Sequence, residues 1–317
     1  MNLNFKLYVI TMVIVLVVIF SVTVGAYEYT ARSFGMGGAF TAIAEGVEAS
    51  LYNPAGLDDD RYAGIQFSGG LSAYNMDKLE ELQDVDDSVG YANVVDILEV
   101  LTEDVGLSGQ MLFGARITSI GLAYNIEEEA FVEYEGGQNV KYNNKSVREG
   151  IFTYGNNIID PPLELGALSY GFNLKLIDIS KKSYDLANDI ERDVKGNGYG
   201  LDVGLLAKVT NNLRLGCTIE NLLVSDITLN GEEREYEYNG STWESISTKK
   251  YSDKEDMDAN VRIGAALNIP VVDLTLALDI DNFIDSRDGG QVLHFGLEKD
   301  LFFNGFSLRA GKINGDS

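Results

Sequence analysis

Residues 200–222, GLDVGLLAKVTNNLRLGCTIENL, alternate apolar side chains with polar or small ones on both sides of an Asn-Asn pair. A period of two is the signature of a β-strand with two different faces. Asn tolerates the left-handed backbone conformation that tight hairpin turns require. The stretch therefore predicts an antiparallel hairpin that turns at Asn211 and Asn212.

The same alternation recurs in four later stretches, at residues 261–268, 274–281, 293–298 and 306–311. One face of these strands is apolar, whereas the other mixes Gly and Ala with isolated charged side chains. The exposed face of a soluble β-sandwich would be dense with Lys, Glu and Thr, but a barrel lumen combines small residues with scattered charges. We therefore predict an all-β, antiparallel transmembrane β-barrel and keep a sandwich as the alternative. The charged residues expected to face the lumen are Arg214, Glu220, Arg262, Asp279, His294, Glu298 and Arg309.

The connections between strands differ in length, which favours an outer-membrane barrel. Short turns are expected at residues 210–212 and 269–272, and long, mostly acidic outer loops at 143–162 and 225–258. Short periplasmic turns and long outer loops are typical of such barrels. Residues 87–104 break the β-pattern with apolar residues at helical spacing, which predicts one short amphipathic loop helix that caps the barrel mouth.

The chain begins like an exported protein. Lys6 precedes an apolar run over residues 7–20, and small residues stand at Val24 and Ala26. This arrangement predicts a signal peptide over residues 1–26, cleaved after Ala26. An uncleaved anchor is the alternative, although the run is short for a membrane helix. No other apolar run approaches the length of a membrane helix, so the mature chain is expected to be either soluble and exported or a barrel.

Composition excludes several classes of protein. The formal net charge of −25 argues against nucleic-acid binding, which needs clustered Lys and Arg. The single cysteine, Cys217, excludes an intramolecular disulfide framework. The single histidine, His294, has no nucleophile, base or zinc-spaced partner that we can name, so we expect neither an enzyme nor a metal or cofactor site.

The most specific motif follows the predicted cleavage site: ARSFGMGGAFTAIAEG at residues 31–46 and ASLYNPAGL at residues 49–57. Its glycines and small residues permit tight turns and close packing, and no βαβ unit accompanies them as in a dinucleotide-binding motif. The block resembles the N-terminal plug of FadL-like outer-membrane proteins. Strand motifs at residues 198–205, 211–216, 221–222, 262–265 and 308–311 resemble the PorV-like branch (PorV and PorQ) of that superfamily.

The resemblance implies a domain organisation and a size. Residues 27–60 would form the plug and residues 61–317 the barrel, with the plug residues Phe34, Gly35, Gly37, Gly38, Asn53, Pro54 and Gly56 inside it. The resemblance implies 14 strands, whereas alternation identifies only about ten or eleven. We therefore expect the barrel to be truncated at its C-terminus, with a smaller barrel as the alternative.

The resemblance also implies function. The first expectation is an outer-membrane protein that takes up or binds hydrophobic small molecules such as fatty acids, with outer-membrane lipid around it. The alternative is a PorV-like barrel that interacts with secretion-system proteins. A structural outer-membrane protein is the third hypothesis.

Overall fold

The computed structural model describes residues 30–57, 63–75, 103–136, 139–159, 166–284, 290–301 and 306–314. The predicted signal peptide lies outside these residues, and so does the predicted helix at 87–104 apart from Glu103 and Asp104. Within the described part, no helix is long and apolar enough to cross a membrane.

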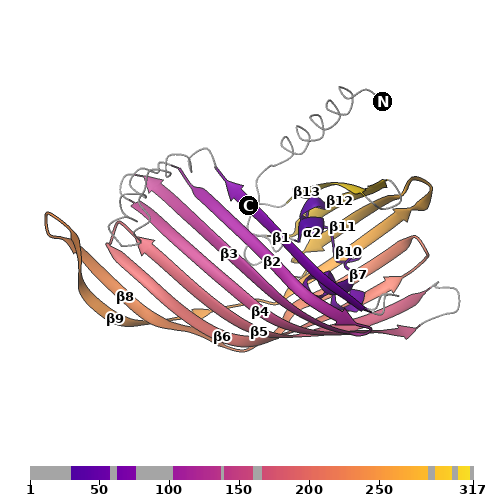
Figure 1. Ribbon diagram of the computed structural model, residues 1–317, viewed down its shortest axis with the longest axis horizontal. Coiled ribbons are helices and arrows are strands. Elements are labelled where there is room, and N and C mark those ends of the chain that lie inside the picture. Colours follow the sequence, from indigo (N-terminus) through magenta and orange to yellow (C-terminus); the bar gives the residue numbers. More distant parts are fainter. Residues whose placement is uncertain are drawn as a thin grey trace, which may run out of the picture.

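One antiparallel sheet of thirteen strands makes up most of the described chain (Figure 1). Its strands are β1 (Ala63–Tyr74), β2 (Val105–Ile117), β3 (Ile120–Gly136), β4 (Asn139–Ile159), β5 (Ala167–Asp185), β6 (Ile190–Lys208), β7 (Leu213–Val224), β8 (Ile227–Tyr238), β9 (Trp243–Glu255), β10 (Asn260–Ile269), β11 (Leu274–Asp281), β12 (Val292–Leu301) and β13 (Phe306–Asn314). Ahead of the sheet lie α2 (Ala31–Gly35), η1 (Gly46–Glu48), α3 (Ala49–Tyr52) and η2 (Pro54–Leu57), and η4 (Pro270–Val272) joins β10 to β11.

The sheet branches at β6, because two strands pair with different parts of β6. Both β7 and β8 pair with β6, one after the other, while β9 pairs with β8 and β10 pairs with β7. Without β8 and β9, eleven described strands follow one another around the sheet. The sequence predicted about ten or eleven strands, which agrees with the eleven that remain without β8 and β9. Strands β8 and β9 themselves were not predicted.

The predicted hairpin at residues 200–222 is confirmed. Strands β6 and β7 pair in antiparallel register, with Lys208 opposite Arg214 across the turn at Asn211 and Asn212. The four later stretches with the same alternation form β10 to β13.

The two faces of the wall have opposite chemistry. On β2, the side chains of Met111 and Phe113 are exposed. Leu112, which lies between them, and Arg116, three residues after Phe113, are buried on the opposite face. Other strands expose apolar side chains in the same way, including Phe67, Leu122, Leu176, Leu205 and Phe295. An exposed apolar face is unfavourable in water and suits lipid, so the soluble sandwich is excluded and the antiparallel membrane barrel is the fold.

Both of the long loops expected from the sequence are instead strands. Residues 143–159 belong to β4, and residues 227–255 form the β8–β9 hairpin, which reaches beyond the neighbouring strands in Figure 1. These segments carry polar side chains on both faces, so the apolar alternation that reveals the membrane strands is absent there. The backbone of these segments is still paired in the sheet, although their side chains show no apolar alternation.

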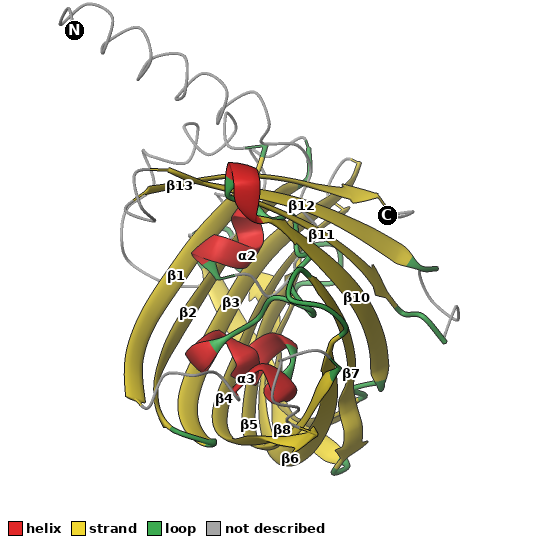
Figure 2. Ribbon diagram, turned by 90° about the vertical axis from the view of Figure 1, so that its right-hand side faces the viewer, coloured by secondary structure: helices red, strands yellow, loops and turns green. Residues whose placement is uncertain are grey.

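The N-terminal segment, residues 30–57, lies on the concave face of the sheet (Figure 2). We call this concave face the interior face. Helix α2 sits between β1 and β13, where Ala31 donates a backbone hydrogen bond to Ser68 of β1 and Gly35 packs on Arg309 of β13. In the described part, β1 and β13 are not paired with each other, so the sheet is not closed.

Candidate functional site

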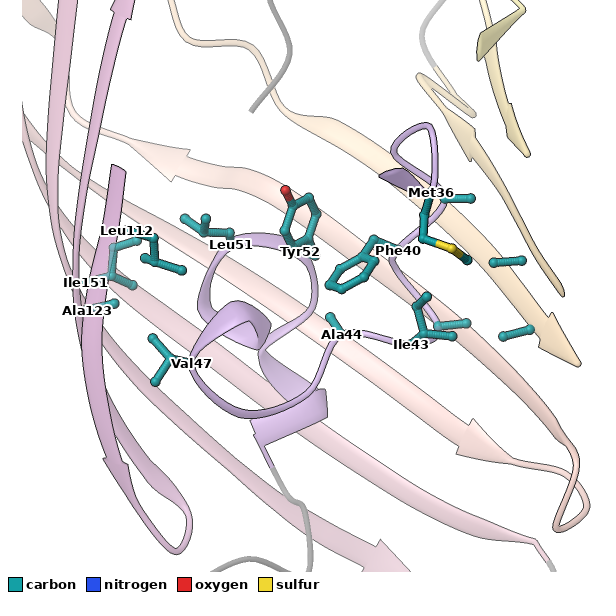
Figure 3. Close-up of a cluster of buried hydrophobic side chains, with 14 residues drawn as sticks. Met36, Phe40, Ile43, Ala44, Val47, Leu51, Tyr52, Leu112, Ala123 and Ile151 are labelled. Carbon is teal, nitrogen blue, oxygen red and sulfur yellow. The ribbon is translucent and has the colours of Figure 1, made fainter. Parts of the chain in front are cut away.

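An apolar core joins the N-terminal segment to the wall (Figure 3). Met36, Phe40 and Tyr52 are almost fully buried, and the rings of Phe40 and Tyr52 meet edge to face at 4.9 Å. Leu112 and Ile151 contribute from the wall. Burial of several large side chains holds the segment inside the sheet, because each one removed from water stabilises packing by about 1.5–3 kcal/mol.

Glycines on the interior face of the strands allow this close contact. A Cβ atom on Gly204 would lie 2.2 Å from Asn53 Oδ1, and one on Gly171 would lie 2.3 Å from the carbonyl carbon of Pro54. On β7, a Cβ atom on Gly216 would lie 2.6 Å from the carbonyl oxygen of Thr41. The small residues that marked a lumen face in the sequence are therefore the positions where the N-terminal segment presses against the wall.

Asn53 anchors the tightest turn of the segment. Its Nδ2 donates hydrogen bonds to the carbonyl oxygens of Thr41 and Leu205, both at 3.0 Å, and its Oδ1 accepts one from the Ala55 amide at 3.1 Å. Pro54 starts η2 directly afterwards. The Asn-Pro pair thus ends α3, starts the next turn and binds the β6 backbone.

Two wall residues hold the glycine-rich part of the segment. Asp279 Oδ2 accepts hydrogen bonds from the backbone amides of Phe40 and Thr41, both at 2.7 Å. His294 Nδ1 lies 2.7 Å from the carbonyl oxygen of Gly37, so this ring nitrogen donates the hydrogen bond. His294 Nε2 lies 3.3 Å from Asp281 Oδ2.

Ion pairs tie the start and the middle of the segment to the wall. Arg32 forms a two-point interaction with Glu298 at 2.8 and 3.0 Å, and Arg309 joins the same carboxylate. Burial disfavours the charge on Arg32, but the hydrogen bond with Glu298 raises the pKa of its guanidinium above the ordinary value. In the middle of the segment, Glu45 pairs with Arg214 of β7.

Six further charged residues form a group beside the segment that we call the belt: Glu149, Lys175, Asp202, Glu220, Arg262 and Asp281. Arg262 pairs with Glu220 at 3.1 Å and with Asp281 at 2.7 Å. Lys175 pairs with Asp202 at 3.0 Å, and Glu149 lies 3.6 Å away. Charges buried in this way need partners, and the belt supplies them. No group of His, Cys, Asp and Glu side chains that could hold a metal ion is found among the described residues.

The structure thus gathers the charged residues singled out in the sequence on the interior face of the wall. Five of them contact the N-terminal segment, namely Arg214, Asp279, His294, Glu298 and Arg309, and the belt contains the other two, Glu220 and Arg262. Among the residues predicted for the plug, Gly37 adopts a positive φ of 61° against Gly311, and Gly38 also has a positive φ. Gly56 lies against Ala44, where a Cβ atom would be 2.0 Å from the carbonyl oxygen. Phe34 differs from the others, since 47% of its surface is exposed.

Several anchoring residues were missed in the sequence. Arg116 donates to the carbonyl oxygen of Leu57 at 2.7 Å, Thr218 donates to that of Tyr52 at 2.9 Å, and Asn173 donates to that of Ser50 at 2.9 Å. Each is a polar residue inside an apolar alternating strand, and that signal could have identified them. The belt residues Lys175, Asp202 and Asp281 obey the same rule but were not among the candidate residues, and Glu149 lies in the part of β4 where the alternation is absent.

Comparison with known proteins gives matches of two kinds. A family model described as "F plasmid transfer operon, TraF, protein" matches residues 147–281, less than half of the chain. Comparison with curated protein sequences finds no match. The crystal structure of the toluene transporter TodX of Pseudomonas putida is similar over 92% of this chain and 84% of TodX, with 14% identity and a TM-score of 0.55.

This chain has the TodX fold. A deltaS2 mutant of TodX, titled a monoaromatic hydrocarbon channel, gives a similar result, with 13% identity, 91% and 82% coverage and a TM-score of 0.56. At such identities the likeness concerns the fold alone. It agrees with the antiparallel membrane barrel expected from the sequence and does not distinguish the PorV-like branch.

Proposed function

We propose that this chain is a bacterial outer-membrane β-barrel, FadL-like in kind, that takes up or binds hydrophobic small molecules. The observation that carries the proposal is a wall with an apolar exterior whose interior is filled by the chain's own N-terminal segment. The TodX fold supports it, because TodX is a toluene transporter. Export through cleavage of residues 1–26 belongs to the same proposal.

In this proposal, residues 30–57 act as the plug that controls passage. Asp279 and His294 hold the segment through its backbone, and Glu298 holds it through the Arg32 side chain. Asn53 of the segment donates a hydrogen bond to the backbone oxygen of Leu205 in the wall. Water can replace such bonds when the segment moves into the periplasm, so a neutral one contributes only about 0.5–1.5 kcal/mol to holding it and one to a charged group about 1.5–3 kcal/mol. Movement of the plug is therefore compatible with its many contacts.

The test is binding and uptake by the refolded full chain. We expect radiolabelled toluene and a fluorescent fatty acid to bind the protein in detergent and to enter proteoliposomes faster than protein-free vesicles. Comparing the two probes separates hydrocarbons from fatty acids as ligands. Absence of both binding and accelerated entry, in a preparation that is folded and inserted, contradicts the proposal.

The second candidate function is a PorV-like interaction with secretion-system proteins. Its support is the β8–β9 hairpin, which reaches beyond the neighbouring strands and exposes Tyr238 and Ile246 by 55% and 59%. A partner that covers these side chains would remove their apolar surface from water, which favours association. Affinity purification from native membranes tests it: partners that co-purify with the natural chain should be lost with Tyr238→Ser and Ile246→Ser together.

A further inference from the structure

A cavity of about 430 Å³ lies on the interior face at the far end of β3 to β6, away from the plug. None of its lining residues belongs to the N-terminal segment. Its volume falls in the range of small-molecule sites, about 300–1,000 Å³. The side chains that carry the argument are Glu129, Phe131, Lys145, Lys181, Arg192 and Tyr251.

The strand register places one acid and two lysines in a row. Glu129 of β3 is directly opposite Lys145 of β4, and Lys145 is directly opposite Lys181 of β5. The Cβ atoms of directly opposite residues are about 5 Å apart. Opposite charges therefore stand on neighbouring strands at the same level of the cavity lining.

The two lysines carry a surplus positive charge. Both pair with a single carboxylate, that of Glu255, which lies 3.0 Å from Lys145 and also contacts Lys181. Two ammonium groups thus share one negative charge, and their side chains remain 40% and 35% exposed. One further anionic group would complete the neutralisation.

Glu129, the acid beside the two lysines, adds a negative charge that is not neutralised. Because Lys145 is engaged with Glu255, the Glu129 carboxylate has no ion pair or hydrogen bond within the described residues. Glu133, two residues further along β3, also lines the cavity and is likewise unpaired in the part of the chain that the structure describes. A cationic group would be favoured here.

Two aromatic side chains complete the lining. Phe131 lies between the two acids on β3, and the Tyr251 ring lies 4.9 Å from the Arg192 guanidinium. Arg192 is itself neutralised by Glu233 at 2.8 Å. Arg192 therefore leaves the local charge surplus unchanged, while the two rings offer apolar surface to a ligand.

We infer that this cavity binds a zwitterion of the amino-acid kind with an aromatic or apolar side chain. The carboxylate of the ligand would pair with Lys145 and Lys181, its ammonium group with Glu129, and its side chain would contact Phe131 and Tyr251. A ligand with only a negative charge would face unpaired Glu129, and one with only a positive charge would face the lysine pair. This site goes beyond the uptake of hydrophobic molecules and does not depend on it.

Three ligands with the same phenyl group test the inference on the refolded full chain by isothermal titration calorimetry. We expect phenylalanine to bind at least about tenfold more tightly than 3-phenylpropionate or 2-phenylethylamine, because each of these lacks one charge-assisted hydrogen bond. Equal or weaker binding of phenylalanine overturns the inference, and this comparison needs no variant.

Substitutions then locate the site. Glu129→Gln should weaken the binding of phenylalanine by about tenfold and leave the binding of 3-phenylpropionate unchanged or tighter. Lys181→Met should weaken the binding of both ligands. Glu128→Gln, at the adjacent position on the other face of β3, is the matched control and should change neither. Unchanged phenylalanine affinity in Glu129→Gln contradicts the proposed site.

Discussion

The carboxylate of Asp279 accepts a hydrogen bond of 2.7 Å from the backbone amide of Thr41, a residue 238 positions earlier in the chain. The same oxygen accepts a second bond of 2.7 Å from Phe40. One wall side chain thus satisfies two adjacent backbone donors of the N-terminal segment, where no regular secondary structure could do so. The contact joins β11, late in the chain, to the small-residue stretch near its start.

Replacing Asp279 by Ala should therefore loosen the segment locally. Two buried amides would lose their acceptor, at about 1–3 kcal/mol each. We expect amide hydrogen exchange in a peptide covering residues 36–44 to accelerate at least about tenfold. Asp178→Ala, at an exposed site on β5, serves as control. Exchange as slow as in the natural protein would show that Asp279 does not hold the segment.

Gly204 and Gly150 form a second matched pair of positions. A Cβ atom on Gly204 would meet Asn53 Oδ1 at 2.2 Å, whereas one on Gly150 would have Leu176 Cβ as its nearest neighbour, 4.0 Å away. Gly204→Ala should cost about 1–3 kcal/mol through overpacking, and Gly150→Ala should be nearly neutral. Urea unfolding of the two variants in detergent measures the difference. Equal stabilities would mean that the segment does not press on β6 as described.

The sequence predicted the wall well wherever one face is apolar. Alternation located the β6–β7 hairpin and β10 to β13, because lipid on one side and a filled interior on the other impose a period of two. It failed at residues 143–159 and 227–255, which are strands with polar side chains on both faces. There the backbone pairing depends on the neighbouring strands and leaves no periodic trace in the side chains.

The interior was predictable only in part for a related reason. A charged residue in an apolar strand shows that it faces inward, as for Arg262 and Glu298, but alternation cannot reveal its partner. The pairing of Glu298 with Arg32 joins residues 266 positions apart and depends on how the N-terminal segment lies in the sheet. Glu255, at the end of β9, pairs across the interior with β4 and β5 in the same unforeseeable way.

The pair between Arg32 and Glu298 predicts how α2 is retained. Glu298→Gln would remove the charge that Arg32 and Arg309 share, so α2 should detach from β12 more readily. We expect faster chymotrypsin cleavage after Phe34, whose side chain is already 47% exposed. Glu244→Gln on the β8–β9 hairpin should leave cleavage at Phe34 unchanged. If the two variants are cleaved equally fast, the ion pair has no part in holding α2.

Phe113 and Tyr238 test whether the exposed apolar face contacts lipid. Their side chains are 57% and 55% exposed, but Phe113 lies on the wall at β2 and Tyr238 at the end of β8. An Arg near the middle of the bilayer costs about 2–4 kcal/mol, and one near the interface or in water costs little. Phe113→Arg should therefore lower the free energy of unfolding in phospholipid vesicles by that amount, whereas Tyr238→Arg should change it little. For a wall exposed to water, both substitutions would be tolerated alike, so equal small effects would contradict the membrane assignment.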